Sequence, residues 1–217
     1  MRRLLHLEAG RCRARHGPGA DGPGEDRSGQ VSEPPPHTGR KGKGLRVMTT
    51  SAIEASEQVI RLVRENEGFA NHADGCTPAM IERAERELGL AFPPSYLRLL
   101  EEFGTWEIGA KEFLGVYQTP ARRDALLGTV ADTLGDRVAL GLPHHLMVIM
   151  HDDVWDVVVL DTSLPDKNRE FPVYAWNPGV LDGGLMEKVA DDFGSFALAE
   201  CRQALKTADA MSRAVDG

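Results

Sequence analysis

Cysteine is scarce in this chain of 217 residues, and long apolar runs are missing. The three cysteines, Cys12, Cys76 and Cys201, lie far apart and form no CxxC pair, so the sequence suggests neither a zinc site nor a disulfide framework. No apolar run approaches the ~18 residues that would span a bilayer. We therefore expect a soluble protein of the reducing cytoplasm that makes no contact with a membrane.

Catalytic patterns are missing as well. Ser95 and Ser195 stand outside any nucleophile elbow, and no pattern places a histidine to serve them. Cys76 lacks a thiolate-activating motif, and Cys201 fits a core position. Glu85 lies beside the apolar face of an expected helix, which favours a structural role such as capping the proline corner that follows. We predict that the chain is not an enzyme and uses no cofactor; the missing constellation argues against the alternative, an unrecognised hydrolase.

Histidines and acids flank one apolar run in a way that invites comparison with a metal site. His144 and His145 precede the run, and His151, Asp152 and Asp153 follow it. At ~3.3 Å per residue, a straight strand would separate the two groups by ~20 Å, which one ion cannot span. No HExxH pattern is present either. We predict that the chain holds no metal.

Charge and composition divide the chain near Met48. Residues 1–47 are rich in Gly and Pro and hold ten Lys and Arg against five Asp and Glu, about +5, which leaves about −13 for residues 48–217. We expect residues 1–47 to be a disordered arm, since they have little apolar surface to bury, and residues 48–217 to form a single domain. Three interpretations of the arm stay open: a start assigned upstream of a true start at Met48, a nucleic-acid-binding arm, or a tail of other use. The first is favoured, so nucleic acid is not an expected partner.

The hydrophobic periodicity of residues 48–217 predicts helices interleaved with strands. Helices are expected over 52–66, 78–88, 94–103, 122–134 and 191–207, and strands over 112–117, 146–150, 157–160 and 171–176. Ile53 is expected on the buried face of the first helix, and Leu134 on that of the fourth. The runs at 146–150 and 157–160 are continuous and apolar, which indicates strands covered on both faces and joined as a hairpin. The order predicts an α+β fold with a mainly antiparallel sheet and helices packed on it.

The helices expected over 78–88 and 94–103 have the clearest sequence signals for their ends and their buried face. Thr77 and Pro78 are typical of a helix start, and Gly89 is typical of a left-handed helix end. In the next helix, the stripe Tyr96, Leu99, Leu100 and Phe103 has the i, i+3, i+4, i+7 spacing of a buried face.

The ordered set of these residues resembles the SUKH superfamily, which includes Smi/Knr-like fungal cell-wall regulators and bacterial immunity proteins. The resemblance covers about residues 53–205. It rests on Ile81, Glu85, Leu88, Gly89, Phe92, Pro93, Tyr96, Leu100, Gly104, Leu160, Asp161, Pro172, Val173, Trp176, Ser195 and Phe196. One departure is the segment at 151–155, where many members have a Gly-rich acidic turn.

This resemblance implies a protein-binding module without enzymatic activity. Bacterial members often cap and neutralise a polymorphic toxin, commonly a nuclease or deaminase, whereas fungal members act as signalling scaffolds. We expect an immunity protein whose partner is a basic toxin, because the acidic body would attract one. A regulatory scaffold without a toxin partner is the alternative.

Tryptophans next to acidic residues are the candidate partner contacts. Trp155 lies in the expected hairpin turn with Asp152, Asp153 and Asp156, and Trp106, followed by Glu107, lies in an expected loop. Loop tryptophans bordered by charge suit binding hot spots, although each ring could equally cap the edge of the core. Trp176, on a family strand, is expected to be packed.

Overall fold

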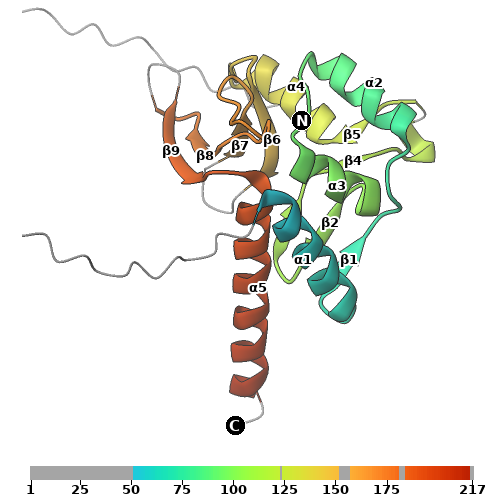
Figure 1. Cartoon of the computed structure of the whole chain (residues 1–217), viewed down its shortest axis with the longest axis vertical. Helices are drawn as coiled ribbons and strands as arrows, with labels where there is room; N and C mark the ends of the chain where they lie inside the picture. The colour runs from blue at the N-terminus through green and yellow to red at the C-terminus, as the bar shows by residue number, and fades with distance from the viewer. Residues whose placement is uncertain (1–50, 123, 152–156, 181–183, 216–217) are drawn as a thin grey trace, which may run out of the picture. The chain divides into compact units, whose positions relative to one another are not determined.

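The computed structural model describes residues 51–122, 124–151, 157–180 and 184–215 (Figure 1). The helices in these ranges are α1 (Ala52–Glu65), α2 (Pro78–Leu88), α3 (Pro94–Phe103), the short 3-10 helix η1 (Pro120–Arg122), α4 (Thr129–Ala139) and α5 (Phe193–Val215). The strands are β1 (Ala70–His72), β2 (Trp106–Ile108), β3 (Lys111–Phe113), β4 (Val116–Tyr117), β5 (Leu127–Gly128), β6 (Leu146–His151), β7 (Val157–Asp161), β8 (Val173–Asn177) and β9 (Leu185–Ala190).

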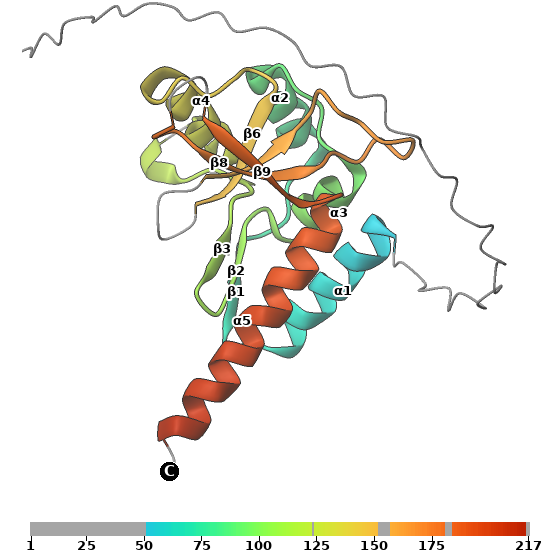
Figure 2. The same cartoon turned by 90° about the vertical axis from the view of Figure 1, so that its left-hand side faces the viewer.

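The strands form three antiparallel sheets, with the orders β1-β2-β3, β4-β5 and β6-β7-β8-β9. Helices α1 and α5 run side by side, and α5 continues past the end of α1 (Figure 2). The predicted α+β class is therefore confirmed.

Local signals set the helix ends as the sequence predicts. The Thr77 hydroxyl accepts a hydrogen bond from the Met80 N–H at 3.3 Å, and Gly89 ends α2 with a φ of 68°. The Phe92 N–H donates to Glu85 Oε1 at 2.8 Å, which confirms that this carboxylate caps the proline corner. Such bonds satisfy backbone groups that a helix end leaves without a partner.

The main core is built around the stripe of α3. Tyr96, Leu99, Leu100 and Phe103 are each at most 1% exposed, as their spacing predicts. The Tyr96 ring lies edge-on to Phe193 of α5, with centroids 4.8 Å apart. Aromatic pairs of this geometry stabilise a core beyond their buried area.

The central hairpin is buried on both faces, also as predicted. Met147 of β6 and Leu160 of β7 face the main core, whereas Val148 and Val159 face a smaller cluster that contains Trp176. Trp176 is 1% exposed, so the expectation that it is packed is confirmed.

Three predicted details are wrong. The strand expected at 112–117 is broken into β3 and β4, which lie in different sheets. The helix expected at 122–134 begins only at Thr129, and Leu134, expected to point inward, is 36% exposed. Ile53 was assigned to the buried face of the first helix, but its side chain is 40% exposed.

The broken strand has a tertiary cause. The Leu114 N–H donates to the Ile149 carbonyl of β6 at 2.9 Å, and the Val116 N–H donates to the Gly104 carbonyl at 2.8 Å. A Cβ at Gly115 would lie 1.5 Å from that same Gly104 oxygen. The chain therefore turns here, at a close approach that only glycine allows.

Candidate protein-binding face

The four predicted contacts at the hairpin turn, Asp152, Asp153, Trp155 and Asp156, lie outside the described residues. The strands on either side of them are described. β6 and β7 pair antiparallel, with His151 opposite Val157. The predicted strand hairpin is thus confirmed, and the role of its turn stays a prediction.

Trp106 does not lie in a loop. It is the first residue of β2, it is 1% exposed, and its ring stacks on Phe113 with centroids 5.0 Å apart. The loop assignment was wrong because three-residue strands such as β2 are too short to show a period in the sequence. Of the two predicted contacts Trp106 and Glu107, only Glu107 is exposed and can be reached by a partner.

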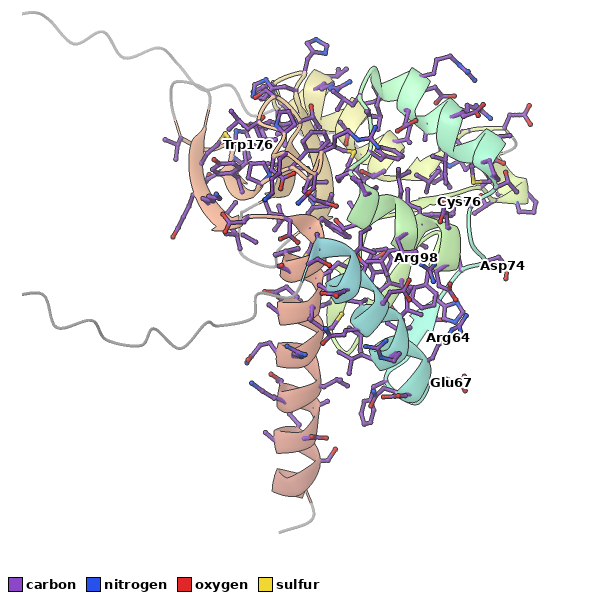
Figure 3. The ribbon with its side chains drawn as sticks, in the orientation of Figure 1. Arg64, Glu67, Asp74, Cys76, Arg98 and Trp176 are labelled. Atoms are coloured by element: carbon purple, nitrogen blue, oxygen red, sulfur yellow. The ribbon has the colours of Figure 1, made fainter. Side chains whose placement is uncertain are left out.

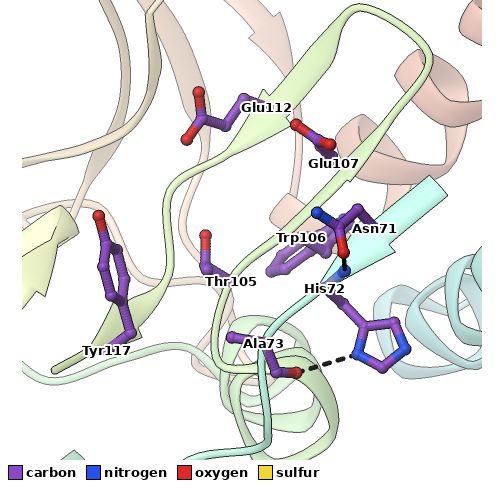
Figure 4. A pocket seen from close by; sticks show the side chains of 8 residues that line it. All are labelled: Asn71, His72, Ala73, Thr105, Trp106, Glu107, Glu112 and Tyr117. Atoms are coloured by element: carbon purple, nitrogen blue, oxygen red, sulfur yellow. Dashed lines mark hydrogen bonds between the residues drawn. The ribbon is translucent and has the colours of Figure 1, made fainter. Parts of the chain in front are cut away.

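Glu107 stands in a row of polar side chains on the outer face of the first sheet. Asn71 of β1 lies opposite Glu107 of β2, which lies opposite Glu112 of β3. The two carboxylates border a hollow of about 290 Å³ that Thr105 and Tyr117 also line (Figure 4). Like charges placed directly across two strands repel each other, so this pair is not there for stability.

Two more carboxylates continue this acidic surface onto α4. Asp132 Oδ2 lies 3.5 Å from Nε2 of His151, the last residue of β6. Asp136, one helical turn further on, and Glu112 also act on His151 through their charge. We call Glu107, Glu112, Asp132 and Asp136 the acidic face.

Burial and charge perturb the pKa values on this surface. The hydrogen bond to Asp132 raises the pKa of His151, against the opposing effect of burial. Burial is also the main cause that raises the pKa of Asp136, and the negative charge of Asp132 adds to it. His151 is therefore held toward its cationic form by its acidic neighbours.

Two arginines away from this face are paired with acids. Arg98 of α3 donates to Glu57 at 2.6 Å and to Glu102 at 3.0 Å, and Arg64 of α1 also pairs with Glu102. Figure 3 labels the two arginines on their helices. By contrast, within the described residues no Lys or Arg forms an ion pair with a member of the acidic face. The charge of Glu107 and Glu112, which are both exposed, is thus available to a cationic partner.

The serines and cysteines considered as catalytic residues have structural roles. Glu170, which the sequence did not single out, accepts bonds from the backbone and hydroxyl of Ser95. Ser195 bonds to Asp192 in the same manner. Burial raises the pKa of Cys76 to about 11 and that of Cys201 to about 12, so both are thiols at neutral pH.

Metal ligands do not converge among the described residues: no three His, Cys, Asp or Glu side chains there are placed to hold an ion. Those residues also contain no helix that is long and apolar enough to cross a membrane. A separate apolar hollow of about 390 Å³ lies beside the outer end of α5, between the exposed side chains of Phe69 and Met211.

Comparison with known proteins agrees with this fold. The family model SUKH_5, described as SMI1-KNR4 cell-wall, matches residues 56–202, which is more than half of the chain. The chain belongs to this family, whose members typically bind proteins and are generally not enzymes. No match was found among curated proteins.

Proposed function

We propose that this chain is an immunity protein that binds a basic toxin and blocks its active surface. The single observation that carries the proposal is the acidic face, which a member of a protein-binding family presents without an internal ion pair to Lys or Arg among the described residues. The strongly negative body, about −13 over residues 48–217, adds long-range attraction for a cation-rich partner.

Electrostatics and burial would have separate roles in this complex. Carboxylates such as Glu107 and Glu112 speed the encounter with a basic surface, and their effect falls as salt screens them. Once the partner docks, an aromatic side chain contributes buried area and slows dissociation. The predicted contact Trp155 is our candidate for that role.

The proposal is tested by identifying the partner and its effect on cells. Tagged protein is used to retain partners from an extract of its own source, with a Glu107→Lys, Glu112→Lys variant as the matched control. The retained protein is then expressed alone and together with this chain. We expect growth arrest by the partner alone and rescue by coexpression.

A regulatory scaffold is the second candidate, and the cell-wall description of the family is the observation that favours it. It predicts a retained partner that does not arrest growth. If every partner retained by the wild-type protein is also retained by the control variant, the acidic face is not the binding surface.

A further inference from the structure

His151 lies at the junction of three elements. Helix α4 is tied to β6 at Val148, whose carbonyl accepts a hydrogen bond from Thr129 and whose N–H donates to the Thr133 hydroxyl at 3.0 Å. Both bonds are buried and carry no charge. The contact between His151 and Asp132 is a further link between these elements, and it differs from the others because it can be protonated.

The groups that face His151 are mostly acidic. Asp132 and Asp136 face it from α4 and Glu112 from β3, whereas Val157, its partner on β7, is apolar. One imidazole therefore interacts with the negative charge of three carboxylates. With a proton it offsets part of the repulsion between Asp132 and Asp136; without one, that repulsion is uncompensated.

We propose that His151 is a proton-operated clasp that holds α4 to the end of β6 when it is protonated and sets the charge of the acidic face. Loss of the proton loosens the α4 contact and makes this face more negative by one charge. Resting on the proposed function, the second consequence is faster association with a basic partner as the pH rises.

The pH at which the clasp opens follows from the geometry. The Asp132 hydrogen bond and the surrounding acids raise the pKa of His151 above its usual 6.5. A raised folded-state pKa means that the stabilisation is complete below about 6.5 and is lost as the pH rises through the folded value. The clasp is therefore closed at pH 6.5 and opens only as the pH rises above that value.

NMR titration of the free protein tests the clasp directly. We expect the His151 imidazole to titrate above 6.5, with a downward shift of its midpoint in Asp132→Asn. Hydrogen exchange of α4 amides should accelerate as the pH rises through that midpoint, beyond the intrinsic pH dependence of exchange. This excess should vanish in His151→Gln and persist in the control His144→Gln, which changes an exposed histidine before β6.

The outcomes separate the clasp from the proposed function. A His151 midpoint at or below 6.5, or the same excess exchange in His151→Gln as in wild type, overturns the clasp whether or not a partner exists. If the clasp titrates but association with the retained partner has the same pH dependence in wild type and His151→Gln, the link to binding is overturned. If no partner is retained, the proposed function fails and the titration still decides the clasp.

Discussion

Glu107 and Glu112 lie directly opposite each other on the antiparallel strands β2 and β3, so two exposed carboxylates share one cross-strand pair. The fold keeps this repulsion without a Lys or Arg partner among the described side chains. Such a pair is expected where charge serves recognition at some cost in stability.

Neutralising one member should therefore stabilise the protein. We expect Glu107→Gln to raise the free energy of unfolding by about 0.2–1 kcal/mol, with a larger gain at low salt. Chemical denaturation at two ionic strengths measures this. Glu187→Gln on β9 is the matched control, because its cross-strand partner is Ala175 and no acid is relieved. Equal effects of the two substitutions would contradict the cross-strand repulsion.

Glu170 acts as a remote cap for α3. Its carboxylate accepts the Ser95 N–H at 2.9 Å and the Ser95 hydroxyl at 2.6 Å, and it is 3% exposed. Pro93, at the cap position, has no side-chain bond to offer. We expect Glu170→Ala to lower the free energy of unfolding by about 2–4 kcal/mol, because two donors lose their acceptor in the interior. An unchanged denaturation midpoint would rule out this cap.

The same carboxyl should make stability depend on pH. Burial is the main cause that raises the pKa of Glu170, and the Ser95 bonds oppose it. The folded state then holds a proton that the unfolded state releases, so the Glu170 contribution falls as the pH rises from about 4.5 through the raised value. Glu170→Gln should remove this component from a plot of stability against pH. A plot parallel to that of the wild type would contradict the raised pKa.

Core truncations in α3 should destabilise the fold. Leu100→Ala is expected to cost about 2–5 kcal/mol, because the side chain is fully buried. Tyr96→Phe keeps the ring against Phe193 but removes the hydroxyl bond to the Leu114 carbonyl at 2.7 Å, and we expect a smaller loss of about 1 kcal/mol. Thermal and chemical unfolding measure both. If Tyr96→Phe lowers the free energy of unfolding as much as Leu100→Ala, the hydroxyl bond stabilises α3 as much as the packing of Leu100 does.

These residues show what a sequence can and cannot predict. The stripe of α3, the α2 caps and the buried hairpin followed from spacing, because local periodicity determines which face is buried. Ser95 and Glu170 are 75 positions apart, and only the tertiary fold brings them together. The same holds for Asp132 and His151, although the acids at 132 and 136 and the histidine at 151 were each visible in the sequence.

Short strands were the other limit. β1, β2 and β3 have three residues each, too few to show an alternation, so Trp106 was assigned to a loop. The turn after β3 depends on the approach of Gly115 to Gly104, which no local pattern predicts. The candidate face was therefore only partly predictable: Glu107 was named, and Glu112, Asp132 and Asp136 required the structure.

Removal of residues 1–47 should leave the body unchanged. Their composition breaks near Met48, and the family match begins only at residue 56. We expect a deletion variant to unfold at the same temperature as the full chain. A loss of several degrees would show that the arm packs on the domain.

The central claim is that acidic groups attract the partner while an aromatic side chain retains it. Surface binding kinetics with the retained partner, measured across ionic strength, test this most directly. Asp153→Lys and Glu107→Lys should slow association, most strongly at low salt, whereas Trp155→Ala should mainly hasten dissociation. Glu187→Lys, on β9, is the control for a change of net charge alone. Wild-type kinetics in the three test variants, with folding intact, would contradict the account and direct attention to the apolar hollow at Phe69 and Met211.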